Sequence, residues 1–170
     1  MGEAQRVASM HPLWGASTRV LSGKNCLVLD CGNDPAACAA EDLFAGTAAR
    51  LQRLPLEEHD RAMAYTLGLP HALNLLFGDV LSASPYPFEA LRTLGGPTFL
   101  KQSAVAAEVA SENREMYRQI QHLNPHTAGV DAALRSAIDA LAIRRADPAA
   151  FAQRMAQDDT YFARFREWWP

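Results

Sequence analysis

The sequence predicts a mostly α-helical fold preceded by a small α/β unit. One nearly continuous apolar run, Asn25–Cys31, is typical of a strand that is covered on both faces. From residue 56 onward, apolar residues recur at helical spacing and no segment is a convincing strand. The chain has 170 residues, of which 49% are hydrophobic and 21% charged, so it can bury a core and has the composition of an ordinary globular protein.

The α/β unit is expected to contain three strands and one helix. A short strand, Arg6–Met10, ends at His11-Pro12, and the apolar run forms the second strand. Asp34-Pro35 then supplies an N-cap and a proline at the first helical position. The Ala-rich helix that follows should reach about Leu51, where the chain returns as a third strand through Leu54. A unit of this length predicts a parallel strand pair with a right-handed crossover.

The rest of the chain is expected to be helical. Leu56 to Ser82 has the pattern of one long helix, which Pro70 should bend because proline removes a backbone donor and clashes with the preceding turn. Two turn-rich segments, 84–87 and 95–97, interrupt the pattern. Further helices are expected over residues 98–110, 112–123 and 128–145.

Asp147-Pro148 is the predicted start of a last helix. This helix carries large apolar side chains along one side, namely Phe151, Met155, Phe162, Phe165 and Trp169. Such a stripe indicates core or a subunit interface, not a cofactor site.

Composition excludes several classes of function. The net charge of −3 gives no basic surface for nucleic acid or an anionic membrane, and no apolar run approaches the roughly 20 residues that span a bilayer. No secretory signal pattern is present. The three cysteines form no CxxC pair, so we expect no disulfide framework and no zinc site, and a reducing cytoplasm is the default location. His122 and His126 are separated by Pro125, which breaks the helix that would align them for a metal.

Three motifs together resemble the prephenate dehydrogenase family over about residues 6–165. The first is His11-Pro12-Leu13-Trp14-Gly15, similar to the family's HPMFG turn. The second combines Glu58-His59-Asp60 with Met63-Ala64 and Leu69-Pro70-His71. The third is Gly95-Gly96-Pro97-Thr98-Phe99 followed by Tyr117, Ile120-Gln121 and Asn124-Pro125. Each motif is weak alone, but their order and spacing match the family.

The resemblance implies a two-part architecture. Residues 1–55 would be a truncated Rossmann-like βαβ remnant, and residues 56–170 a helical domain like the C-terminal domain of 6-phosphogluconate dehydrogenase. Family enzymes make a tyrosine precursor by oxidative decarboxylation with a nicotinamide cofactor, dimerise through the helical domain, and bind substrate in the cleft between the two parts. We therefore expect a homodimer that binds a small carboxylic acid.

The dinucleotide-binding glycines of the family are missing. A GxGxxG loop lets the backbone approach the pyrophosphate at a helix N-terminus, and here no two glycines are separated by a single residue. We therefore expect no cofactor. Many family members also place an arginine after the Gly-Pro turn to bind a substrate carboxylate; our alignment puts Leu100 there, with Lys101 and Gln102 beside it.

The resemblance also suggests site residues. His11 would be the general base that hydrogen-bonds the substrate's ring hydroxyl, since an imidazole titrates near neutral pH, and His71 would line the same pocket. Trp14 and Tyr65 are candidates for stacking on the ring, although packing is the favoured role for both. Lys101 and Gln102 are candidates for binding a carboxylate. His59 at the start of its helix is expected to be structural.

Three functions are compatible with these observations. The first is a cofactor-independent isomerase, lyase or cyclase of specialised metabolism, in which His11 and His71 act as general acid and base on a cyclic or aromatic carboxylic acid. The second is the C-terminal part of a prephenate or arogenate dehydrogenase whose NAD(P)-binding part is missing or supplied elsewhere. The third is a non-catalytic binding or dimerisation module.

Overall fold

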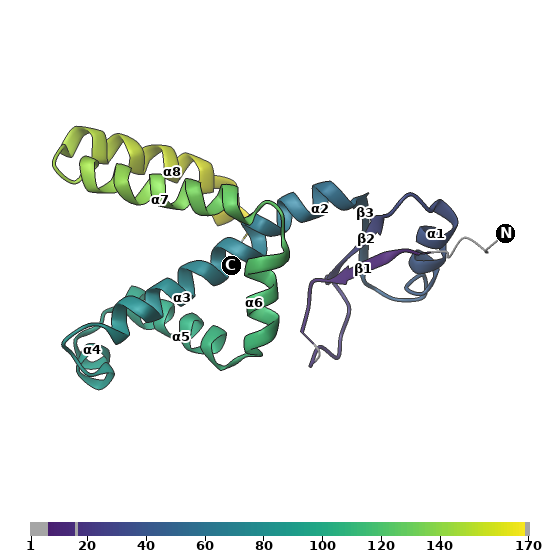
Figure 1. The fold of residues 1–170 in the computed structure, drawn as a ribbon, viewed down its shortest axis with the longest axis horizontal. Coiled ribbons are helices and arrows are strands. Elements are labelled where there is room, and N and C mark those ends of the chain that lie inside the picture. Colours follow the sequence, from purple (N-terminus) through teal and green to yellow (C-terminus); the bar gives the residue numbers. More distant parts are fainter. Residues whose placement is uncertain (1–6, 16, 169–170) are drawn as a thin grey trace. The chain divides into compact units, whose positions relative to one another are not determined.

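The computed structural model describes residues 7–15 and 17–168 and confirms the predicted fold class, mostly helical with a small α/β unit (Figure 1). Two compact units are present, residues 1–127 and 128–170. The predicted boundary between residues 55 and 56 falls within the first unit, where strand β3 is followed directly by helix α2, and as a domain boundary it stays a prediction.

The sheet has three strands in the order β1-β2-β3. Strands β2 (Asn25–Asp30) and β3 (Arg50–Pro55) are parallel, as predicted, and β1 (Ser9–Pro12) pairs antiparallel with β2. The prediction for the first strand was wrong in its bounds, because pairing with β2 begins only at Ser9 and continues through Pro12. His11 therefore lies inside β1 and not beyond its end. Arg6 lies outside the described residues.

Helix α1 (Asp34–Asp42) is shorter than predicted. Its N-cap is Asn33 and not Asp34, since the Asn33 side chain accepts a hydrogen bond from the Ala36 N–H. The helix ends well before residue 51 because Thr47 forms its own turn, its hydroxyl donating to the Phe44 carbonyl. The buried face of α1 packs Ala37 and Ala40 against Val28 of β2 as a small core.

The predicted long helix is three consecutive segments, α2 (Leu56–Met63), a π-helical turn η1 (Ala64–Gly68) and α3 (Leu69–Ser82). The irregularity lies in the turn before Pro70, where a bend was expected. The Leu69 N–H donates to the Ala64 carbonyl, five residues back. Pro70 thereby falls in the first turn of α3, where its missing N–H leaves no helical bond unmade.

Three further helices complete the first unit, α4 (Phe88–Leu94), α5 (Pro97–Ser111) and α6 (Arg114–Leu123). The sequence analysis missed α4, because prolines and glycines at both of its ends indicated only a break. Helices α3 and α5 pack together, and α6 contacts η1.

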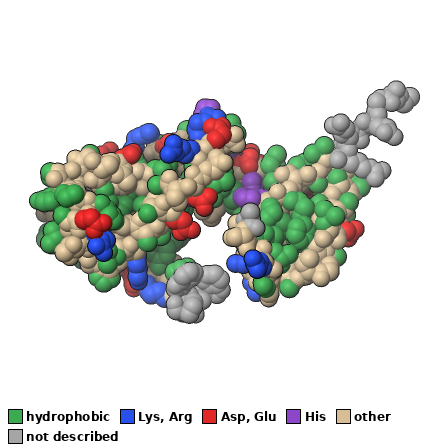
Figure 2. All heavy atoms as spheres, turned by 90° about the horizontal axis from the view of Figure 1, so that it is seen from below, with side chains coloured by type: hydrophobic (Ala, Val, Ile, Leu, Met, Phe, Trp, Pro, Cys, Tyr) green, Lys and Arg blue, Asp and Glu red, His purple; other side chains and the backbone are tan. Residues whose placement is uncertain are grey.

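The second unit is formed by α7 (Thr127–Arg144) and α8 (Pro148–Trp168), joined by residues 145–147 (Figure 1). The predicted cap is confirmed, since the Asp147 carboxylate accepts from the N–H groups of Ala149 and Ala150. None of the described side chains of α8 is buried, although many are large and apolar. Figure 2 shows hydrophobic side chains, in green, over much of the visible surface. None of the helices in the described part combines the length and the hydropathy that crossing a bilayer requires.

Candidate functional site

A chain of hydrogen bonds joins three titratable side chains of the first unit. Nδ1 of His11 lies 2.9 Å from Nε2 of His59, and Nδ1 of His59 lies 2.8 Å from Oδ1 of Asp60. The two imidazole rings meet edge to face, with their centroids 5.2 Å apart. We call these three residues the His11–His59–Asp60 chain.

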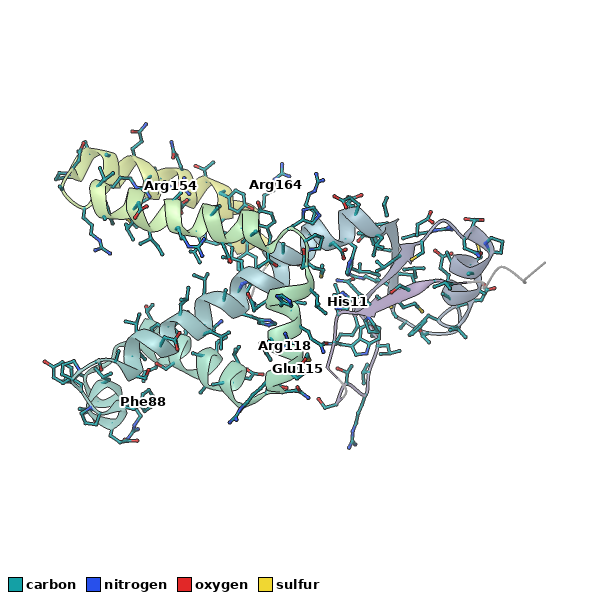
Figure 3. The ribbon with its side chains drawn as sticks, in the orientation of Figure 1. His11, Phe88, Glu115, Arg118, Arg154 and Arg164 are labelled. Atoms are coloured by element: carbon teal, nitrogen blue, oxygen red, sulfur yellow. The ribbon has the colours of Figure 1, made fainter. Side chains whose placement is uncertain are left out.

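Two elements far apart in the sequence hold the side chains of the His11–His59–Asp60 chain. His11 is fixed by the β1 ladder, where it is paired with Leu27 next to the fully buried Val28. His59 and Asp60 lie on α2, which starts immediately after β3. Figure 3 shows His11 on β1, the strand drawn in purple. The β1–β2–β3 pairing thus brings an N-terminal strand against a helix that begins more than forty residues later.

A pocket of about 280 Å³ opens beside this chain. Its size is at the lower end for small-molecule sites. Four apolar side chains line it, together with five polar ones: the three side chains of the His11–His59–Asp60 chain and two amides. The lining residues are His11, His59, Asp60, Met63, Leu67, Gln119, Ile120, Leu123 and Asn124. We call it the β1–α2–α6 pocket.

Two features fix the shape of this pocket. The Asn124 side-chain amide donates to the Asp60 carbonyl at 2.6 Å and, through its oxygen, accepts from the His126 N–H at 2.9 Å, which ties the end of α6 to α2. The Gln121 amide donates to the Gly68 carbonyl at the end of η1. Because π-helical turns occur preferentially at functional sites, the position of η1 against this wall supports a role for the pocket.

Burial favours the neutral form of His11. Removal from water lowers the pKa of its imidazole, and the neighbouring His59 lowers that pKa further because two positive imidazoles repel each other. A neutral imidazole can accept a proton, so His11 has the protonation state that a general base requires near neutral pH.

His71 has different surroundings. Its ring packs against Tyr117 of α6, with centroids 4.5 Å apart, and it is not among the residues that line the β1–α2–α6 pocket. Nδ1 of His71 is buried without a hydrogen-bond partner, and burial lowers the pKa of the ring. The predicted role of His71 beside His11 stays a prediction.

The predicted ring-stacking residues also lie outside the lining. Trp14 is half-buried against Phe44, with ring centroids 6.4 Å apart. Tyr65 is 55% exposed on η1.

The residues predicted to bind a carboxylate are on α5. Lys101 is exposed, and the Gln102 amide donates to Oδ1 of the buried Asn74 at 2.8 Å. Asn74 in turn donates to the Pro70 carbonyl. Gln102 is therefore used in the packing of α5 on α3, and a role in substrate binding stays a prediction for both residues.

The sequence analysis missed the place of His59 and Asp60 in the site. The sequence does contain a clue, because His59 and Asp60 are adjacent and a carboxylate next to a histidine can orient its ring. Only the fold shows that the other side of that ring contacts His11. Within the described residues, no three His, Cys, Asp or Glu side chains are arranged as ligands of a metal ion.

Comparison with known proteins identifies similarity to one family of dehydrogenases. The 4-amino-4-deoxyprephenate dehydrogenase of Streptomyces pristinaespiralis is 29% identical over 154 residues, which are 89% of this chain and 52% of that protein. This chain therefore spans about half the length of the curated relative that it matches.

Two solved structures have the same fold. Synechocystis arogenate dehydrogenase matches with a TM-score of 0.73 and 12% identity over 95% of this chain and 62% of that one. Prephenate dehydrogenase from A. aeolicus, in complex with hydroxyphenyl propionate and NAD+, matches with a TM-score of 0.71 and 16% identity over 94% of this chain and 58% of that one. A family model described as the dimerization domain of prephenate dehydrogenase matches residues 55–157. Because the matched residues are more than half of this chain, the chain belongs to the prephenate dehydrogenase family.

Proposed function

We propose that this chain is the substrate-binding and dimerisation part of a dehydrogenase that acts on a prephenate-type acid, as in tyrosine biosynthesis. The substrate class is a cyclohexadienyl carboxylic acid with a hydroxyl or an amino group on the ring. The observation that carries the proposal is the half-buried His11, whose pKa is lowered by burial, at the wall of the β1–α2–α6 pocket in a protein of this family.

His11 would accept the proton of the ring hydroxyl or amine while the carbon that bears this group is oxidised. This step needs an acceptor within hydrogen-bond distance whose pKa lies near or below neutral pH. His11 has the lowered pKa, and one of its ring nitrogens is not used by His59. Both ring substituents, hydroxyl and amino, occur among the substrates named for the relatives. One relative is a 4-amino-4-deoxyprephenate dehydrogenase, and the others are prephenate or arogenate dehydrogenases.

A nicotinamide dinucleotide would supply hydride transfer, but the described residues do not fit it. The turn between β2 and α1 contains a single glycine, Gly32, and the first turn of α1 carries the Asp34 carboxylate, which would repel a diphosphate. The nearby Arg53 guanidinium is already paired with Asp34 at 2.5 Å and lies 3.6 Å from Asp30. The dinucleotide would have to be held by a separate nucleotide-binding part.

The comparisons favour this function over the cofactor-independent chemistry that the sequence analysis put first. The relatives are dehydrogenases by name, and one of them is seen with NAD+. Isomerase, lyase or cyclase chemistry therefore has no support beyond the absence of the glycine loop. We also propose that the chain forms a homodimer, because the matched family model is a dimerisation domain and α8 exposes apolar side chains.

Binding of two aromatic acids tests the proposal without a dinucleotide. Calorimetry of the purified chain with 3-(4-hydroxyphenyl)propionate and 3-(4-aminophenyl)propionate should show saturable binding of at least one of them. His11→Ala should weaken that binding roughly tenfold or more, the loss expected for one hydrogen bond to a buried group. His122→Gln is the matched control, because His122 is exposed on α6 and is not among the pocket residues.

Two results would contradict the proposal. One is the absence of binding by either acid, and the other is equal binding by His11→Ala and the wild-type chain. Conversion of prephenate by the purified chain with no dinucleotide present would instead support the cofactor-independent function.

A further inference from the structure

We infer that Asp60, acting through His59, fixes His11 with its proton on Nδ1, so that the bare Nε2 of His11 accepts a hydrogen bond from the ligand. Asp60 and His59 would then be positioning residues, because His11 alone meets the reacting group. The tautomer follows from the geometry of the His11–His59–Asp60 chain. Its consequence for ligand selection rests on the proposed function.

The direction of the hydrogen bonds is set at the carboxylate. An ionised carboxylate can only accept, so Nδ1 of His59, at 2.8 Å from Oδ1 of Asp60, must carry the proton. The Asp60 side chain is 32% exposed, so water also reaches this carboxylate.

The same argument passes from His59 to His11. A neutral His59 that donates from Nδ1 has a lone pair on Nε2, which can only accept. Nδ1 of His11 lies 2.9 Å from that nitrogen and must therefore donate. The remaining nitrogen of His11, Nε2, is then bare and available to a ligand. The His59 side chain is only 13% exposed. A doubly protonated His59 would donate from both nitrogens and would reverse this direction.

The surrounding backbone restricts how the side chains of the His11–His59–Asp60 chain can move. The Asn124 amide donates to the Asp60 backbone carbonyl at 2.6 Å, which fixes the main chain from which the carboxylate extends. His11 is held in the β1 ladder opposite Leu27. The two rings are inclined by 74°, an angle that is compatible with a hydrogen bond between in-plane ring nitrogens.

An unprotonated Nε2 of His11 favours ligands that donate a hydrogen bond at this position. A hydroxyl or an amine can donate to it, whereas an ether or a ketone oxygen at the same place would bring two acceptors together. Leaving a buried acceptor without its donor costs more than a missing contact. The site should therefore bind a ring hydroxyl or amine and reject the corresponding methyl ether, which matches a reaction that begins by removing a proton.

Nuclear magnetic resonance of the chain labelled with ¹⁵N-histidine measures the tautomer directly, because long-range ¹H–¹⁵N correlations separate protonated from bare ring nitrogens. The chain has five histidines, so single substitutions assign the signals. At neutral pH the wild-type chain should show His11 and His59 each protonated on Nδ1 and bare on Nε2. Asp60→Ala should reduce the preference of His11 for this tautomer by roughly tenfold, the equivalent of one charge-assisted hydrogen bond.

Glu58→Gln is the matched control, since it removes an exposed carboxylate from the same turn of α2. It should leave both tautomers unchanged. His11 protonated on Nε2 in the wild-type chain, or a doubly protonated His59 at neutral pH, would overturn the inference. So would an unchanged His11 tautomer in a folded Asp60→Ala variant. If Asp60→Ala does not fold, the wild-type spectrum alone still decides.

A ligand series then tests selection. The wild-type chain should bind 3-(4-hydroxyphenyl)propionate roughly tenfold or more tightly than the 4-methoxy analogue, and Asp60→Ala should narrow that ratio. Equal binding of the two acids by the wild-type chain would overturn the selection. Binding of neither acid would refute the proposed function and leave the tautomer result standing.

Discussion

His11 and His71 are two partly buried histidines whose surroundings favour the neutral ring. Burial lowers the pKa of both, and for His11 the neighbouring His59 adds to this effect. In the unfolded chain both rings regain their ordinary pKa of about 6.5. Below that pH the unfolded chain binds more protons than the folded one, so the folded state loses stability as the pH falls. Above it both states are neutral and the two groups have no effect.

The first prediction concerns this pH dependence. In urea unfolding of the wild-type chain, these two groups should leave the free energy of unfolding unchanged above about pH 6.5 and decrease it as the pH falls from there toward the lowered pKa values. His71→Phe should make this decrease smaller, because it removes one of the two titrating rings. A His71→Phe variant with the same pH dependence as the wild-type chain would contradict the assignment.

The same substitution separates two roles of His71. Nδ1 of His71 is buried without a partner, and its ring packs on Tyr117. At pH 7, phenylalanine keeps the ring contact and removes the unsatisfied nitrogen, so the free energy of unfolding should be unchanged or higher by about 1 kcal/mol. Ligand binding by the variant, followed by calorimetry, then shows whether His71 is needed for more than packing. Unchanged binding would contradict the predicted role of His71 at the substrate site.

At the residue scale, the sequence could show which neighbours along the chain interact, but not which distant ones do. His11 was predicted from a motif, and Asp147 as a cap from its place before a proline. His59 was expected to be structural, because its contact with His11 depends on the pairing of β1 with β2 and on the start of α2 after β3. No local pattern contains that information.

At the scale of elements, the turn η1 explains how Pro70 is accommodated. The sequence predicted a bend because an interior proline removes a helical hydrogen bond. The structure instead changes register before the proline, with the Leu69 N–H bonded to the Ala64 carbonyl, so that α3 begins anew. This solution was not predictable, since a bend and a π-helical turn remove the same conflict.

Substitution of Pro70 tests this explanation. Because Pro70 lies in the first turn of α3, Pro70→Ala should change the free energy of unfolding by no more than about 1 kcal/mol. An interior proline would give a gain of roughly 3 kcal/mol on replacement by alanine. Chemical denaturation measures the difference. A gain near the larger value would contradict the assignment of Pro70 to a helix start.

The two ends of α6 allow a matched comparison. Asn113 caps the N-terminus by accepting from the Met116 N–H, and Asn124 at the other end holds the Asp60 carbonyl. Asn113→Ala should cost about 1 kcal/mol of stability. Asn124→Ala should cost a similar amount, about 1–2 kcal/mol, because it removes two hydrogen bonds at a half-buried position.

Only Asn124→Ala should disturb the site, since Asn113 has no contact with α2 among its described hydrogen bonds. Histidine ring signals, recorded by nuclear magnetic resonance, should therefore shift for His59 in Asn124→Ala and stay in place in Asn113→Ala. Identical spectra for the two variants would mean that Asn124 does not position Asp60.

At the scale of the whole molecule, the fold class followed from the sequence because it depends on average patterns. The apolar strand at 25–31 and the helical spacing after residue 56 predict the same fold class even when the bounds of single elements are wrong. Helix α4 was missed because it is short and flanked by prolines and glycines, which outweigh a seven-residue pattern. The apolar stripe of α8 could be predicted to lie in a core or an interface. The sequence could not identify the surface that covers it, because an apolar stripe does not specify its partner.

The last prediction concerns the homodimer. None of the described side chains of α8 is fully buried, and in its apolar stripe Met155 is 60% and Phe162 52% exposed. A second copy of the chain would remove this surface from water, which stabilises association by about 25 cal/mol per Å² of apolar area before the costs of binding. Analytical ultracentrifugation should find a dimer at micromolar concentration. Met155→Glu combined with Phe162→Glu should shift it toward the monomer, whereas Gln153→Glu, which adds one negative charge at an exposed position of the same helix, should not. A wild-type monomer, or a doubly substituted chain that dimerises as well as the wild-type chain, would show that α8 is not part of the interface.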